Sequence, residues 1–140
     1  MCGEANTMPI LGEPAPDFEA LTTNGIVKLS DFKGKWLVLF SHPADFTPVC
    51  TTEFIAFSAI ADELKSLNVQ LMGLSIDSVH SHLAWIRNVK EKMGVDIPFP
   101  IIADLDMNVA KKYGMIHPGQ SSTAAIRAVF FIDDKGILRA

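Results

Sequence analysis

Residues 36–54 read WLVLFSHPADFTPVCTTEF, which predicts a strand, a connecting loop and the start of a helix. The run Trp36–Phe40 is entirely apolar and lacks glycine and proline, as is typical of a strand buried on both faces. From about residue 48 to 66, apolar residues instead recur at helical spacing, which predicts a helix with one stripe facing a core. This stripe consists of Phe54, Phe57, Ala61, Leu64 and Leu67.

Cys50 stands at the start of the predicted helix. Thr47 suits the capping position, and Pro48 suits the first turn because the N–H that proline lacks would have no helical partner there. Cys50 then lies among unpaired N–H groups near the positive end of the helix dipole, which favours thiolate over thiol. A single cysteine is more often a small buried apolar residue, but that role needs neither a threonine three residues earlier nor flanking prolines. We therefore interpret Cys50 as a reactive nucleophile, with the Thr47 hydroxyl directed into the same space.

The rest of the chain continues the alternation of strands and helices. Before these two elements, the sequence predicts a hairpin within residues 14–30 around the turn Asn24-Gly25. After them, it predicts a strand at Val69–Ile76 and a helix at 79–93, which is capped by Asp77-Ser78 and ended by Gly94. The remaining predicted elements are a strand at Phe99–Ala103, a short helix capped by Asp106 and ending at Tyr113-Gly114, and a closing hairpin of Val129–Ile132 and Ile137–Arg139. The apolar stripe of the 79–93 helix comprises Leu83, Ile86 and Val89. This order predicts an α/β fold with a mixed central sheet flanked by helices.

Composition favours one domain over residues 1–140, because this length can bury a sizeable core and no shift in composition marks a boundary. The formal net charge of −4 and the scattered basic residues argue against nucleic-acid binding. Apolar runs of strand length predict no membrane span, and the start of the chain, Met1–Glu4, does not resemble a signal peptide. Two cysteines cannot form a disulfide framework, so we expect a reducing cytoplasm.

The segment Pro43–Cys50 resembles the peroxiredoxin signature, Pro-x-x-x-Thr/Ser-x-x-Cys, and the longer stretch Ser41–Phe54 is similar to the one-cysteine, peroxiredoxin 6-like branch. The resemblance extends from Leu11 to Asp133. It implies a thioredoxin-like fold with an N-terminal hairpin extension. It also implies a thiol-dependent peroxidase that reduces hydrogen peroxide and organic hydroperoxides to water and alcohols through a sulfenic acid on Cys50.

The resemblance also assigns roles around Cys50. It implies that Thr47 aligns the peroxide, that Pro43 shields the sulfur, and that Arg127 lies beside the sulfur, where it favours the thiolate. An arginine is usually a surface residue, but the neighbours of Arg127 are apolar, so a partly buried cation would need a partner. The supporting residues are Glu53, which is spaced to orient that guanidinium, Val49 within the signature, and His42, for which a purely structural role is the alternative.

No cysteine follows Cys50, so the resolving thiol that many relatives carry downstream is absent from this sequence. We expect an external thiol to regenerate the protein: thioredoxin, glutaredoxin or a small thiol. Cys2 is the other sulfur, and its place near the N-terminus makes it a weaker candidate for resolving Cys50.

The sequence ends at Ala140, inside the predicted closing hairpin, whereas relatives continue with a helix that covers the sheet. Either a second copy covers the apolar face, or the chain is a fragment of a longer protein. We expect a homodimer, or a ring of dimers, formed through an unpaired strand edge at Ile137–Ala140.

One alternative function is a redox-sensing or holdase chaperone module that uses the same oxidisable cysteine. We expect no cofactor and no metal. The pair His80-x-His82 offers two ligands without an accompanying cysteine or carboxylate pattern, which makes a weak zinc site.

Overall fold

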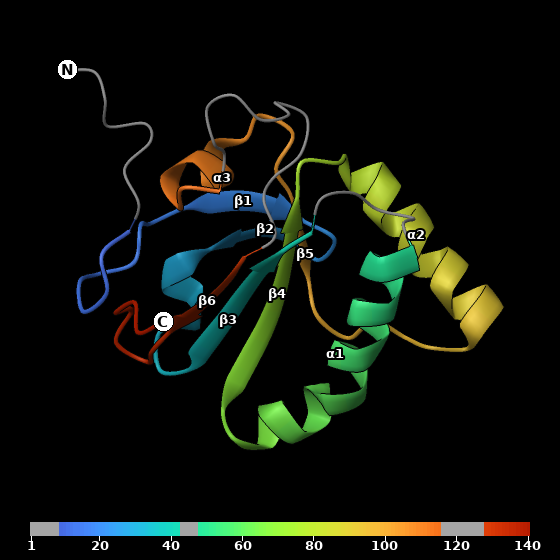
Figure 1. Cartoon of the computed structure of the whole chain (residues 1–140), viewed down its shortest axis with the longest axis horizontal. Helices are drawn as coiled ribbons and strands as arrows, with labels where there is room; N and C mark the ends of the chain where they lie inside the picture. The colour runs from blue at the N-terminus through green and yellow to red at the C-terminus, as the bar shows by residue number, and fades with distance from the viewer. Residues whose placement is uncertain (1–8, 43–47, 116–127) are drawn as a thin grey trace.

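The computed structural model describes residues 9–42, 48–115 and 128–140, with side chains from Thr51 onwards in the helix that begins at Pro48. The strands and helices alternate as the sequence predicts (Figure 1). In chain order they are β1 (Glu19–Thr22), β2 (Gly25–Lys28), η2 (Leu29–Phe32), β3 (Trp36–Ser41), α1 (Pro48–Ser66), β4 (Val69–Ser75), α2 (Val79–Met93), β5 (Ile101–Ala103), α3 (Asn108–Lys112) and β6 (Val129–Ile132).

The strands form one mixed sheet in the order β2-β1-β5-β4-β3-β6, which confirms the predicted architecture. β3 runs parallel to β4 from Trp36↔Val69 to Ser41↔Leu74, and β5 is parallel to β4. β6 and the β1–β2 hairpin are antiparallel to their neighbours. β5 is shorter than predicted because Pro98 and Pro100 flank Phe99, and proline cannot donate to a strand ladder.

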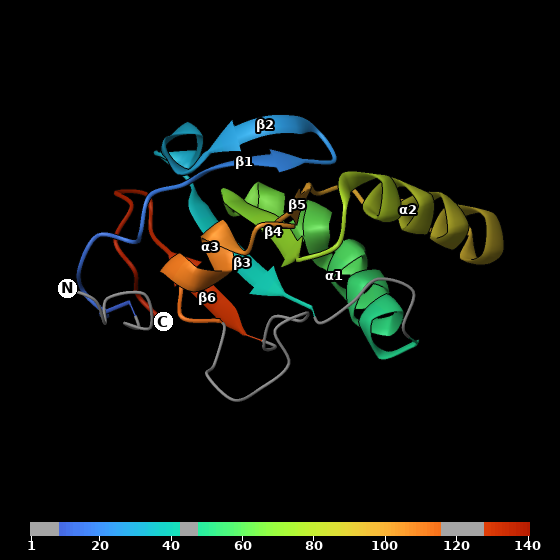
Figure 2. The ribbon, with the colours of Figure 1, turned by 90° about the horizontal axis from the view of Figure 1, so that it is seen from above.

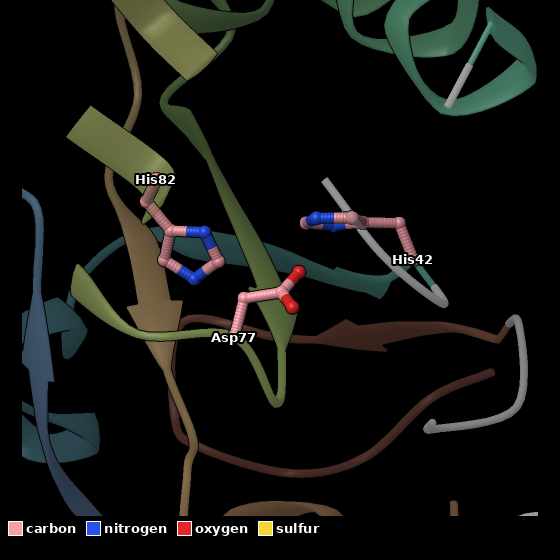
Figure 3. A group of neighbouring side chains, drawn as sticks. All are labelled: His42, Asp77 and His82. Carbon is pink, nitrogen blue, oxygen red and sulfur yellow. The ribbon is translucent and has the colours of Figure 1, made fainter. Parts of the chain in front are cut away.

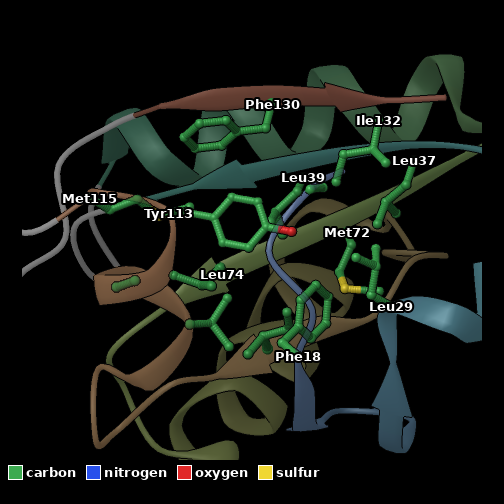
Figure 4. Packing of buried hydrophobic residues seen from close by; sticks show 14 of the residues in the cluster. Phe18, Leu29, Leu37, Leu39, Met72, Leu74, Tyr113, Met115, Phe130 and Ile132 are labelled. Atoms are coloured by element: carbon green, nitrogen blue, oxygen red, sulfur yellow. The ribbon is translucent and has the colours of Figure 1, made fainter. Parts of the chain in front are cut away.

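Successive side chains of β3 enter two separate cores, because neighbouring residues of a strand point to opposite faces. Leu37 and Leu39 pack with α3 and η2 on one face, around Tyr113 and Met72 (Figure 4). Val38 and Phe40 pack in the second core, with residues of α1 and α2. These two helices lie on the other side of the sheet from α3 (Figure 2). The apolar run of β3 therefore reflects burial on both faces, as predicted.

The bounds of α2 agree with the predicted range 79–93. The Ser78 hydroxyl accepts a hydrogen bond from the Ser81 N–H, and Gly94 ends the helix with a positive φ of 69°. The predicted stripe is partly wrong: Val89 is buried, but Leu83 is 40% exposed. The buried face is instead formed by His82, Trp85 and Val89. Leu67 of the earlier stripe is also exposed, because it follows the last residue of α1.

Asp104, rather than Asp106, provides most of the capping of α3. Its carboxylate accepts hydrogen bonds from the N–H groups of Val109 at 3.1 Å and Ala110 at 2.8 Å. Asp106 accepts one hydrogen bond, from the Asn108 N–H, and the residue at the N-cap is Met107. Burial raises the pKa of Asp104 above its ordinary value, although these backbone hydrogen bonds oppose the rise.

The expected unpaired edge at Ile137–Ala140 is wrong over most of its length. On one side this segment pairs with β6, where the Arg139 N–H donates to the Phe131 carbonyl at 2.8 Å. On its other side it pairs with residues 12–15, where the Leu138 N–H donates to Glu13 and the Gly12 N–H donates to Leu138. The chain before β1 therefore occupies the edge that the sequence left open.

An apolar strip remains exposed on the sheet face that carries α1 and α2. It comprises Trp36, Val129 and Phe131, and the last two are 45% and 40% exposed. The β3–β6 register places Val129 and Phe131 on the same face as Phe40 and Val38. Among the described elements, the main helix contacts with the sheet are those of α1 with β4 and of α2 with β5, which leaves β6, at the end of the strand order, less covered on this side. None of the described helices combines the length and hydropathy that a membrane span requires.

Candidate active site

Cys50 is the third residue of α1, which begins at Pro48 just beyond the carboxyl end of β3. This confirms the predicted helix start. The first turn of a helix presents unpaired N–H groups and the positive end of the dipole, which are surroundings that generally favour the thiolate form of a cysteine. The predicted partners Pro43, Thr47 and Arg127 lie outside the described residues, as do the side chains of Val49 and Cys50.

The backbone next to Arg127 is tied to the end of β3. The Ser41 N–H donates to the carbonyl of Ala128 at 2.9 Å, and the Ala128 N–H donates to the Ser41 hydroxyl at 2.9 Å. Ala128 follows Arg127 directly in the sequence. These two hydrogen bonds hold the end of β3 beside the residue that follows Arg127, although Ser41 and Ala128 are 87 residues apart in the sequence.

His42 is buried at the carboxyl end of β3, where its backbone N–H donates to the Leu74 carbonyl at 2.9 Å. Its ring lies among aromatic side chains, with centroid distances of 4.9 Å to Phe54 and 5.1 Å to Trp85. Phe54 is four residues after Cys50 on α1. The structure therefore places His42 against the first two turns of the helix that carries Cys50.

A hydrogen bond fastens the first turn of α1 to α2. The indole N–H of Trp85 donates to the hydroxyl of Thr51, the residue after Cys50, at 3.0 Å. The same indole packs on Phe54 with the ring centroids 4.6 Å apart. This contact gives the buried Trp85 a part in positioning the helix start.

Glu53 lies on the first turns of α1 and is half-buried. Its proposed partner Arg127 is outside the described residues, so the predicted pairing of the two side chains stays a prediction.

The structure also brings together a group of side chains that sequence reasoning missed. His42, Asp77 and His82 each offer one ligand atom, and these atoms all lie within 4.8 Å of one another (Figure 3). The sequence signal was the pair His80-x-His82, but His80 is exposed and only His82 takes part. The group depends on the parallel pairing of β3 with β4, which local spacing does not reveal.

Comparisons with known proteins identify the family to which the chain belongs. Residues 11–140 match the model of the AhpC/TSA family. The chain is 68% identical over 138 residues to a peroxiredoxin of Aquifex aeolicus, covering 98% of this chain and 62% of that protein. It is 63% identical over 132 residues to peroxiredoxin 2 of Caldanaerobacter subterraneus, covering 94% of this chain and 60% of the relative. The chain thus spans about three fifths of the length of the curated relatives that it matches.

Solved structures show the same fold. A yeast mitochondrial 1-Cys peroxiredoxin superimposes with a TM-score of 0.86 at 42% identity, covering 95% of this chain and 66% of that one. A cysteine-to-serine mutant of peroxiredoxin 6 from Arenicola marina gives 0.85 at 42% identity, covering 94% of this chain and 63% of that one. These matches confirm the resemblance to one-cysteine peroxiredoxins. The chain therefore belongs to the AhpC/TSA family and has the thioredoxin-like fold of the peroxiredoxins that it resembles.

Proposed function

We propose that residues 1–140 form a single peroxidase domain that uses Cys50 to reduce hydrogen peroxide and organic hydroperoxides. The observation that carries this proposal is the position of Cys50 in the first turn of α1, at the carboxyl end of a buried parallel strand. The thiolate attacks one peroxide oxygen, so that an S–O bond forms as the O–O bond breaks. The other oxygen takes up a proton and leaves as water or alcohol, and Cys50 becomes a sulfenic acid.

The neighbours of Cys50 would lower the barrier to this attack. Thr47 would hold the peroxide in line, Pro43 would keep water from the sulfur, and Arg127 would stabilise the thiolate and the charge that moves onto the leaving oxygen. The supporting residues would act through these groups. They are His42, Val49 and Glu53.

The reductant would be an external thiol, which attacks the sulfenic acid and releases water. Thioredoxin, glutaredoxin and small thiols all have the required chemistry. In the yeast mitochondrial 1-Cys peroxiredoxin, the thiol is resolved through glutathione and thioredoxin systems. A reducing cytoplasm, where such thiols are maintained, is the compartment that suits the proposal.

Turnover tests the proposed function. With excess dithiothreitol, the chain should consume many molecules of hydrogen peroxide for each Cys50, followed as loss of peroxide over time. Oxidation of one peroxide per chain, with no further consumption while dithiothreitol remains, would contradict the peroxidase proposal and indicate a sensor or holdase module instead.

Arg127→Ala is expected to raise the pKa of Cys50 and slow its reaction with peroxide, because a nearby cation stabilises the thiolate. The measurement is the rate of thiol alkylation against pH, in which the midpoint should move to higher pH. Arg139→Ala is the matched control, since Arg139 pairs with Asp133 in the closing hairpin. An unchanged alkylation midpoint together with an unchanged peroxidase rate in Arg127→Ala would remove Arg127 from the site.

We also propose that the chain forms a homodimer or a ring of dimers. The exposed strip of Trp36, Val129 and Phe131, rather than the edge at Ile137–Ala140, offers the apolar surface that such contact needs.

Phe131→Ser is expected to raise the dissociation constant of the dimer by at least about tenfold, because large aromatic side chains dominate protein interfaces. Sedimentation velocity on the untagged chain measures it. Ile26→Ser is the matched control, since Ile26 is an exposed apolar residue on β2, at the opposite end of the strand order from β6. A wild-type chain that sediments as a monomer at micromolar concentration would refute the dimer.

A further inference from the structure

We propose that His42, Asp77 and His82 bind a zinc ion. The three residues come from separate segments: the end of β3, the loop after β4 and the first turn of α2. Their side chains point towards one another, and their ligand atoms lie within 4.8 Å of each other (Figure 3). This inference does not depend on the peroxidase activity of the chain.

The tautomer of His82 suits metal binding. Its Nε2 lies 2.9 Å from the carbonyl of Ile102, so this nitrogen carries the proton and donates it. The lone pair is then on Nδ1. A metal-bound histidine commonly donates its other ring N–H to a backbone carbonyl, which orients the ring and strengthens the ligand. His82 already makes that second contact.

The other two ligands are also positioned by their surroundings. The hydroxyl of Ser75 donates to the carboxylate Oδ2 of Asp77 at 3.0 Å and accepts a hydrogen bond from the Asp77 N–H. The ring of His42 packs against both Phe54 and Trp85. Side chains that are ordered before the metal arrives lose less conformational entropy when they bind it.

The chemistry of the donor set favours a divalent transition metal over a hard cation. Two imidazole nitrogens and one carboxylate oxygen suit zinc and also iron(II), whereas calcium and magnesium prefer oxygen ligands alone, and zinc is the redox-inert ion of this class to test first. Three protein ligands leave a fourth tetrahedral position for water. Burial of both histidines lowers the local dielectric, and the negative charge of Asp77 offsets part of the charge of the ion.

Binding requires a modest rearrangement. Donor atoms around a tetrahedral zinc ion lie roughly 3.3 Å apart, given zinc–nitrogen distances of about 2.0–2.1 Å. The observed upper limit of 4.8 Å means that some donors must approach by up to roughly 1.5 Å. Asp77 is on a loop and only partly buried, so it is the residue that most readily makes this movement.

The test is zinc titration of the untagged, metal-free full chain by isothermal titration calorimetry. Both thiols are ligands in their own right, so a Cys2→Ser/Cys50→Ser background keeps them from contributing. We expect one zinc ion per chain in this background. Cobalt(II), a spectroscopic substitute for zinc, should give visible absorption bands of a four-coordinate site.

Two variants decide whether Asp77 and His82 hold the ion. His82→Gln and Asp77→Asn should each weaken zinc binding by at least about tenfold and remove the cobalt bands. Asp77→Asn keeps the shape of the side chain, so it remains informative if His82→Gln does not fold, which thermal unfolding of the metal-free proteins would reveal. His80→Gln is the matched control, because His80 lies on the same helix but is exposed, and it should bind zinc as tightly as the background protein.

Three outcomes would overturn the proposal. One is a background protein that binds no zinc at millimolar concentration. Another is folded Asp77→Asn protein with unchanged affinity. The third is an equal loss of affinity in His80→Gln, which would place the ion on the surface of α2.

Discussion

Cys50→Ser is expected to abolish peroxide consumption, leaving only the slow direct reaction between peroxide and the added reductant. The serine hydroxyl has almost the same size as the thiol, but it is not ionised at neutral pH and is a far weaker nucleophile. The helix start that would stabilise a thiolate is unchanged in this variant, so the loss would report on the sulfur itself. The measurement is hydrogen peroxide loss in the presence of dithiothreitol.

The matched control for this experiment is Cys2→Ser, which removes the other sulfur of the chain. We expect it to retain the wild-type rate with dithiothreitol, because an external thiol can reduce the sulfenic acid directly. Peroxide consumption by Cys50→Ser at near the wild-type rate would show that the reactive residue has been misassigned.

Phe54→Ala should lower the free energy of unfolding by about 3–5 kcal/mol, the range for truncating a buried phenylalanine. Phe54 is 1% exposed, and its ring centroid lies 4.6 Å from that of Trp85 and 5.1 Å from that of Phe40. A Cβ added at Gly73 would lie only 2.9 Å from the Phe54 ring, so the glycine on β4 makes room for this side chain. The cavity left by alanine would open between α1 and the sheet.

Urea unfolding followed by circular dichroism measures this loss. Ile60→Ala on the same helix is the matched control, because Ile60 is exposed and its truncation should cost less than about 1 kcal/mol. If both variants lost equal stability, the aromatic cluster around Phe54 would not be the main contact between α1 and the sheet.

Much of the fold could be predicted because its signals are local. The apolar run at Trp36–Phe40 needs no distant partner to indicate burial on both faces. The bounds of α1 and α2 follow from helical spacing and from residues that act within one turn, such as Ser78 at a cap and Gly94 at a left-handed end. The position of Cys50 in the first turn of α1 was predicted for the same reason.

Two predictions were wrong because neighbouring residues could each have filled the same position. Asp104 and Asp106 both precede α3, and spacing favoured Asp106 as the cap. In the structure Asp104 is buried and accepts two hydrogen bonds from the helix start, because the turn after β5 directs its carboxylate inwards. Leu83 was likewise placed on the wrong side of α2, one position from the buried His82.

Two features depend on contacts between segments that are far apart in the chain, so local patterns could not reveal them. Residues 12–15 cover the edge of the closing segment at 136–138, more than 120 positions later. His42 meets Asp77 and His82 because β3 and β4 pair in parallel and end at the same edge of the sheet. Periodicity and capping describe which elements form, since they act within a few residues. The register between strands sets which side chains meet, and that register results from packing of the whole chain.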